Sequence, residues 1–141
     1  MERIEIGAVR EEKVRVEDQN VINFLGLPGA RVLSTPHMIG YMERTSRNLV
    51  LPMLEPGDDS VGTIVNVTHL SGAPLGSEVT FRAEIESVDG RRVNFRVKAY
   101  DDLHVVGEGT HQRFVVTVAK FAERMMRKLE NSTPGSTPQI M

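Results

Sequence analysis

Four polar residues of this chain carry side chains suited to acyl transfer: Thr35, Glu43, His69 and Arg113. A hydroxyl can attack a carbonyl group, and a carboxylate or an imidazole can take the proton that the attack releases. A cation can stabilise the developing negative charge. Together the four residues form a full set for acyl transfer.

Each of these residues also has an ordinary structural explanation. A threonine before a helix usually caps it, and a histidine at the end of a strand is often a satisfied structural residue. Arg113 shares a strand face with His111 and Val115, where an ion pair at a sheet edge would explain it. Only their arrangement in the fold can separate these explanations from a catalytic one.

A long amphipathic helix is predicted in the stretch 32–54, beginning at Pro36. Thr35 is expected to cap it, and proline suits the first helical position. At about 100° per residue, one side of this helix collects the residues with apolar or small side chains: Met38, Ile39, Met42, Ser46, Leu49, Val50 and Met53. This sector must face a sheet.

Glu43 lies on the shoulder of that sector, between Val50 and Leu54. A carboxylate is costly at a buried position unless donors or a cation stabilise it, and such a group can serve as a general base. The alternative is a rim glutamate that reaches water or pairs with Arg47 one turn further on.

Most of the remaining chain has strand-like patterns. A first strand is predicted at residues 12–16, and residues 21–32 form a loop or broken helix that could act as a lid. In the next strand, one face carries alternate residues: Val61, Thr63, Val65, Val67 and His69. A last strand at 105–118, with Gly107 and Gly109 as bulge or close-approach points, precedes a short helix at 121–129.

The two central strands form a hairpin with a predicted three-residue loop, Val88-Asp89-Gly90, in which Gly90 is left-handed. A two-residue Asp89-Gly90 turn would mix polar and apolar faces, whereas the longer loop keeps them apart. The predicted pairs are Ile85 with Val93, Ala83 with Phe95, Phe81 with Val97 and Val79 with Ala99.

The composition excludes several classes of function. With 141 residues, 40% hydrophobic residues, 26% charged residues and a net charge of -2, neither disorder nor nucleic-acid binding is favoured. The absence of cysteine rules out disulfides, thiolate metal sites and a cysteine nucleophile. The four histidines lack paired metal-ligand spacing, so we expect neither metal nor cofactor. Without a signal peptide or membrane span, a cytoplasmic protein is expected.

The order of strand, long helix and four strands predicts an α+β domain with one helix on one antiparallel sheet. We expect a single domain at residues 1–130 and a disordered tail at 131–141, which is rich in Ser, Thr, Pro and Gly. So small a sheet leaves an exposed edge and an incompletely covered face. A homodimer is therefore expected.

Five motifs within residues 32–121 resemble those of hot-dog-fold thioesterases. They are VLSTPHMIGYMER, LEPGDDSVGT, VNVTHLSGAPLG, SVDGRR and GEGTHQRFVV. Within that group they are most similar to fluoroacetyl-CoA thioesterase-like proteins. The resemblance implies a hot-dog fold, in which the sheet wraps around the central helix. It also implies acyl-CoA hydrolysis to the free acid and CoA.

By the same resemblance, Thr35, Glu43 and His69 form the catalytic set, while Gly62 and Arg113 belong to the substrate-binding surroundings. The lid departs from the family's pattern, because Phe24 is the only aromatic residue in NFLGLPGARV. Selectivity for a fluoroacetyl group is therefore not implied.

Two chemical routes remain open, since Thr35 or a water activated by Glu43 could attack the thioester. His69 could shuttle the proton, and the Gly62 N–H could hold the oxyanion. The alternative function is a hot-dog domain that binds acyl-CoA or another small ligand without turnover. A hot-dog hydratase is disfavoured because its Asp-x-Asn-x-x-His pattern is missing near the helix.

Overall fold

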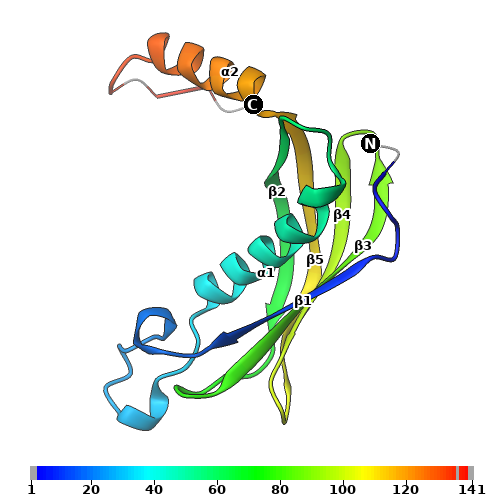
Figure 1. Cartoon of the computed structure of the whole chain (residues 1–141). Coiled ribbons are helices and arrows are strands. Elements are labelled where there is room, and N and C mark those ends of the chain that lie inside the picture. The colour runs from blue at the N-terminus through cyan, green and yellow to red at the C-terminus, as the bar shows by residue number, and fades with distance from the viewer. Residues whose placement is uncertain (1–2, 136, 140–141) are drawn as a thin grey trace.

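A computed structural model of the chain describes residues 3–135 and 137–139. The described part contains one five-stranded antiparallel sheet and two α-helices (Figure 1). Their bounds are β1 Val9–Arg15, α1 Thr35–Val50, β2 Asp58–His69, β3 Glu78–Asp89, β4 Arg92–Tyr100, β5 Val105–Thr117 and α2 Val118–Glu130. Three short 3₁₀ turns lie at Asp18–Asn20, Pro28–Ala30 and Leu51–Met53.

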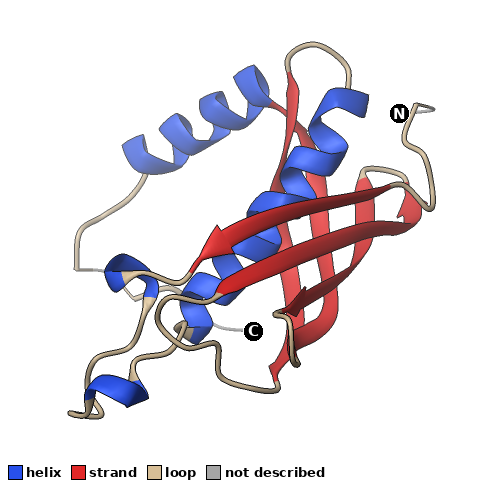
Figure 2. Cartoon of the chain, turned by 60° about the horizontal axis from the view of Figure 1, so that its bottom comes forward, coloured by secondary structure: helices blue, strands red, loops and turns tan. Residues whose placement is uncertain are grey.

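The sheet has the strand order β1-β3-β4-β5-β2, which leaves β1 and β2 at its edges. α1 packs against the concave face of this curved sheet (Figures 1 and 2). The predicted α+β architecture, with one long helix on one antiparallel sheet, is therefore confirmed. The dimer stays a prediction.

The helix α1 begins one residue earlier than predicted, and its cap is a different residue. The Ser34 side chain accepts a hydrogen bond from the His37 backbone N–H at 3.2 Å, and Ser34 has extended backbone angles. The prediction that Thr35 caps the helix is wrong, because Thr35 is already the first helical residue. α1 ends at Val50, since Pro52 lacks the N–H that would continue the ladder.

The buried side of α1 agrees with the predicted apolar sector, except that Thr45 is also buried and Ile39 is only half-buried. It consists of Met38, Met42, Thr45, Ser46, Leu49 and Val50. The two hydroxyls among them are satisfied within the helix, because Thr45 donates to the Tyr41 carbonyl and Ser46 to the Met42 carbonyl. These hydrogen bonds offset the desolvation of the two buried hydroxyls, so both side chains can lie under the helix.

The hairpin β3–β4 shows the predicted faces with a different register. Ile85 pairs with Phe95 and Phe81 with Ala99, so the predicted pairs are wrong by two residues. The loop is Gly90-Arg91, with Gly90 at φ +59°, and a bulge follows Ile85. A shift by two keeps every side chain on its face, which is why the apolar residues of both strands are still buried.

Two glycines on β5 allow close approach, as predicted. A Cβ at Gly107 would lie 2.6 Å from the Met38 sulfur, and one at Gly109 would collide with the Asn66 carbonyl. α1 and β2 can therefore pack closely against β5 in this region.

α2 extends beyond the predicted helix at 121–129 and has no buried residue. It projects away from the sheet, on the side where β2 begins (Figure 1). Residues 131–135 and 137–139 are exposed and form neither helix nor strand, while the rest of the predicted tail lies outside the described residues. No helix in the described ranges is long and apolar enough to cross a membrane.

Candidate active site

Thr35 and His69 come together at one end of the concave face. Thr35 lies in the first turn of α1, His69 is the last residue of β2, and Thr35 Oγ1 is 2.7 Å from His69 Nδ1. If Nδ1 is unprotonated it accepts the hydroxyl proton, which is the arrangement that a threonine nucleophile needs. Among the described residues, the buried His69 Nε2 has no hydrogen-bond partner.

Glu43 and Arg113 form a second cluster near the middle of α1. Glu43 Oε2 lies 3.6 Å from Arg113 Nη1, and the Arg113 side chain is only 6% exposed. The guanidinium also donates from Nε to Ser60 Oγ at 2.7 Å and from Nη2 to the Ser60 carbonyl at 2.8 Å. Burial lowers the pKa of Arg113, and the nearby Glu43 carboxylate opposes this shift.

Gly62 provides the space that this cluster occupies. A Cβ at Gly62 would lie 2.7 Å from Glu43 Oε2 and 3.2 Å from His111 Cε1. The β2 ladder shifts register between Gly62 and Ile64, which is a bulge directly beside the cluster. The predicted substrate-binding residues Gly62 and Arg113 are thus neighbours of Glu43, on paired positions of β2 and β5.

The pairing of Glu43 with Arg47 that the sequence suggested as an alternative does not occur. Arg47 binds Asp59 through two hydrogen bonds, of 3.0 and 2.6 Å. The Arg47 hydrogen bond is the main cause of the lowered pKa of Asp59. Glu43 is therefore left to face Arg113.

His111 belongs to the second cluster, although it was not among the predicted site residues. It is 2% exposed and lies two positions before Arg113 on the same face of β5. Arg113 Nη1 is 3.2 Å from His111 Nε2. The sequence signal was the histidine on the same strand face as Arg113, but alternation alone could not show that this face lies beneath Glu43.

The two clusters do not meet within one chain. Thr35 and Glu43 are separated by eight helical residues, or roughly 12 Å along the axis. Gly62 and His69 lie seven residues apart on β2, roughly 23 Å in an extended strand. One protomer therefore assembles a hydroxyl–imidazole pair and, separately, a carboxylate–guanidinium pair.

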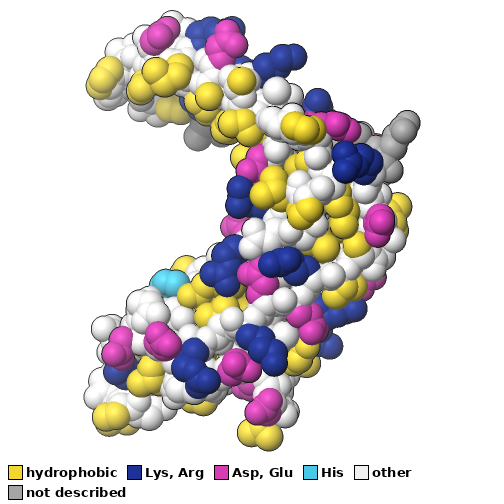
Figure 3. All heavy atoms as spheres, in the orientation of Figure 1, with side chains coloured by type: hydrophobic (Ala, Val, Ile, Leu, Met, Phe, Trp, Pro, Cys, Tyr) yellow, Lys and Arg dark blue, Asp and Glu magenta, His cyan; other side chains and the backbone are white. Residues whose placement is uncertain are grey.

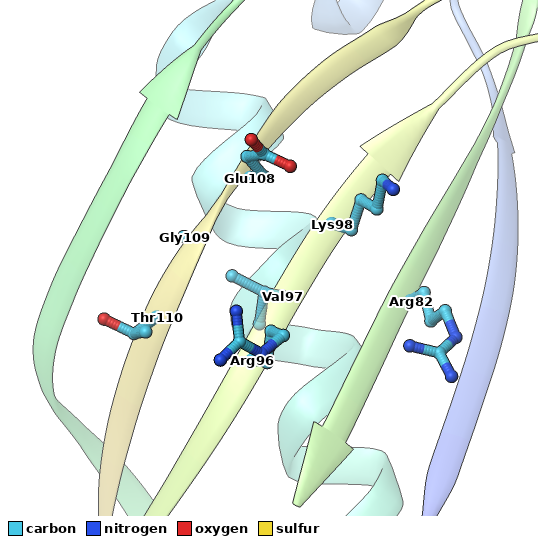
Figure 4. A pocket seen from close by; sticks show the side chains of 7 residues that line it. All are labelled: Arg82, Arg96, Val97, Lys98, Glu108, Gly109 and Thr110. Atoms are coloured by element: carbon cyan, nitrogen blue, oxygen red, sulfur yellow. The ribbon is translucent and has the colours of Figure 1, made fainter. Parts of the chain in front are cut away.

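A surface pocket of about 420 Å³ lies elsewhere, on the convex face of the sheet (Figure 4). Its cationic lining residues are Arg82, Arg96 and Lys98. Arg82 and Arg96 pair with Glu84 and Glu86, respectively. This pocket contains neither cluster, because α1 lies on the other face.

Comparison with known proteins decides the family. A family profile described as "Fluoroacetyl-CoA-specific thioesterase" matches residues 16–119, which include both clusters. The chain belongs to this family. A fluoroacetyl-CoA thioesterase from Streptantibioticus cattleyicolor is 42% identical over 97 residues, covering 69% of this chain and 70% of that protein.

Several solved structures are similar to this chain in fold. The fluoroacetyl-CoA thioesterase FlK superposes with a TM-score of 0.81 at 34% identity, covering 89% of this chain and 97% of FlK. A thioesterase superfamily member from Thermus thermophilus gives a TM-score of 0.81 at 31% identity, over 92% and 96% of the two chains. A hot-dog-like protein from Thermanaerovibrio acidaminovorans gives 0.82 at 26% identity, over 90% and 94%.

These findings confirm the resemblance, the hot-dog fold and the assignment as a thioesterase. The family profile ends at residue 119, so most of α2 lies beyond it. The roles of Thr35, Glu43 and His69 remain predictions at this point.

Proposed function

We propose that this thioesterase hydrolyses an acyl-CoA to the free acid and CoA, with Thr35, Glu43 and His69 as its catalytic residues. The observation that carries the proposal is the 2.7 Å contact between Thr35 Oγ1 and His69 Nδ1 in a chain of this family. A hydroxyl hydrogen-bonded to an imidazole is the minimal arrangement for nucleophilic or base-assisted attack on a thioester.

In this mechanism, Thr35 or a water molecule attacks the thioester carbonyl carbon, and His69 or Glu43 takes the proton released from the attacking oxygen. The Gly62 N–H stabilises the negative charge on the carbonyl oxygen. When the carbon–sulfur bond breaks, the proton passes to the CoA sulfur. If Thr35 attacks, water then hydrolyses the threonyl ester in a second step.

The site is proposed to form between two protomers. β2 is an edge strand with Ile64 52% exposed and Val65 38% exposed, so it offers unpaired backbone groups beside apolar side chains. Antiparallel pairing of β2 with a second copy would bring the last residues of one β2 beside the first residues of the other. His69 and Thr35 of one protomer would then approach Gly62 and Glu43 of its partner.

The shape of the protomer supports this arrangement. Its surface curves around a hollow between α2 and the opposite end of the molecule (Figure 3). A second copy placed along β2 would occupy that hollow. The hydroxyl–imidazole pair and the carboxylate–guanidinium pair would then share one substrate.

Mixing two inactive variants tests the shared site. Thr35→Ala and Glu43→Ala chains should restore part of the activity after subunit exchange, because about half of the sites in a mixed dimer would be intact. No recovery after verified exchange would assign both residues of each site to one chain.

The reaction itself is tested with a panel of short acyl-CoAs, including fluoroacetyl-CoA, and a thiol-reactive dye that reports free CoA. Hydrolysis with a clear order of kcat/KM values supports the proposal and identifies the acyl group. Phe24, the one aromatic residue of the lid, is 76% exposed in the protomer. Binding of acyl-CoA without release of CoA would favour the alternative, a non-catalytic ligand-binding domain.

A further inference from the structure

His111 is a buried titratable residue that the proposed mechanism does not use. It stacks on Phe95, with 6.0 Å between the ring centroids, and both of its ring nitrogens have protein partners. We propose that His111 is a positioning residue which, as a neutral imidazole, holds the Arg113 guanidinium against Glu43. This inference rests on the proposed function, because it assumes that Glu43 takes part in the reaction.

The partners of His111 determine where its proton lies. The Ile64 carbonyl, 2.7 Å from Nδ1, can only accept a hydrogen bond. Arg113 Nη1, 3.2 Å from Nε2, can only donate one. Both bonds form together only when Nδ1 carries the proton and Nε2 presents its lone pair.

The surroundings keep this neutral form. Burial is the main cause of the lowered pKa of His111, and the Arg113 charge lowers it further. The Ile64 hydrogen bond and the Glu43 carboxylate oppose the shift. A second proton, placed on Nε2, would break the bond to Arg113 and set two cations side by side.

His111 provides the third anchor of the Arg113 side chain. Ser60 fixes Nε and Nη2, while His111 fixes Nη1, the nitrogen that lies 3.6 Å from Glu43 Oε2. Because a guanidinium is a planar, rigid fork, three bonds of this kind leave it one orientation. The Glu43 carboxylate therefore faces a cation whose position His111 determines.

The irregular stretch of β2 serves the same arrangement. Ile64, whose carbonyl accepts the hydrogen bond from His111 Nδ1–H, follows the bulge beside Gly62. The missing Cβ of Gly62 leaves room for both Glu43 Oε2 and His111 Cε1. β2 thus holds the imidazole from one side and makes space for the carboxylate on the other.

The test compares His111→Phe, which keeps a ring but loses both hydrogen bonds, with His111→Gln, which keeps an acceptor for Arg113 and cannot titrate. We expect His111→Phe to lower kcat roughly 10- to 100-fold with KM changed less than about twofold. His111→Gln should recover much of this loss. His104→Phe, at the exposed turn before β5, is the matched control and should behave like the wild type.

A double-mutant cycle separates positioning from a merely structural role. If His111 acts through Arg113 on Glu43, adding His111→Phe to Glu43→Gln should cause little further loss. Multiplicative losses in the double variant, or an equal loss in His111→Phe and His111→Gln, would overturn the proposal.

A measurement that needs no substrate distinguishes a failure of the inference about His111 from a failure of the proposed function. Nitrogen-15 NMR of the wild type should show His111 neutral and protonated at Nδ1 near neutral pH. A protonated ring or the Nε2–H tautomer would overturn the inference even in an active enzyme. The expected tautomer without hydrolysis of any acyl-CoA would instead reject the proposed function and leave the arrangement of His111 and Arg113 intact.

Discussion

Replacing Gly62 with alanine should impair catalysis while leaving the fold almost unchanged. The added Cβ would lie 2.7 Å from Glu43 Oε2, whereas ordinary contacts begin near 3.4 Å. The carboxylate must therefore move by about 0.7 Å. A misplacement of about 1 Å can cost roughly 10²-fold in rate, so we expect a 10- to 100-fold fall in kcat/KM.

The cost in stability should be small for two reasons. The obstructing atoms are the end of a flexible side chain that is 40% exposed, so the carboxylate can swing away. Replacing glycine in a strand also stabilises by about 0.4–1 kcal/mol through the unfolded chain. The free energy of unfolding, measured in urea, should change by less than about 1 kcal/mol.

The matched control shortens the obstructing side chain. Glu43→Asp withdraws the carboxylate from Gly62, so Gly62→Ala should have little further effect on kcat/KM in that background. Unchanged kcat/KM in Gly62→Ala alone would refute the close-packing explanation. So would a loss of activity accompanied by a fall of about 3 kcal/mol in the free energy of unfolding, because the fold itself would then be disturbed.

Three further predictions follow from the two clusters. His69→Ala should keep the fold but lose about 10²-fold or more in kcat/KM, and unchanged turnover would remove His69 from the mechanism. Arg113→Lys keeps the positive charge but removes the guanidinium group that contacts Ser60 and His111. Because the buried guanidinium faces Glu43, kcat should fall with little change in KM. A raised KM would instead support the substrate-binding role that the family resemblance implied for Arg113. Because the pKa of His111 is lowered from its ordinary 6.5, the unfolded chain takes up a proton first as the pH falls. The free energy of unfolding should therefore decrease below about pH 6.5, and an equal slope in His111→Gln would contradict this.

The sequence by itself determined the layers of the fold and the faces of its elements. Period-3.6 spacing identified the buried side of α1, and period-2 alternation identified the apolar faces of β3 and β4. These patterns are local, because they depend only on neighbours along one helix or strand. The family motifs are also short stretches of sequence, so those within residues 32–121 were enough to predict a thioesterase.

Register and capping were decided by tertiary structure. The two-residue loop Gly90-Arg91 and the bulge after Ile85 together move the β3–β4 pairs by two residues from the predicted ones. A net shift of two changes no face, so the hydrophobic pattern could not detect it. Ser34 and Thr35 are both acceptable caps by residue type. Thr35 instead uses its hydroxyl to contact His69, a residue far along the chain.

The environment of Glu43 was likewise beyond the reach of the sequence. Helical spacing suggested Arg47 as the partner of Glu43. In the structure, Arg47 binds Asp59 at the start of β2 instead. The cation that reaches Glu43 is Arg113 on β5, in the space left by Gly62 and beside His111. Which polar groups share a buried space depends on how distant strands pair beneath the helix, and only the tertiary structure fixes that pairing.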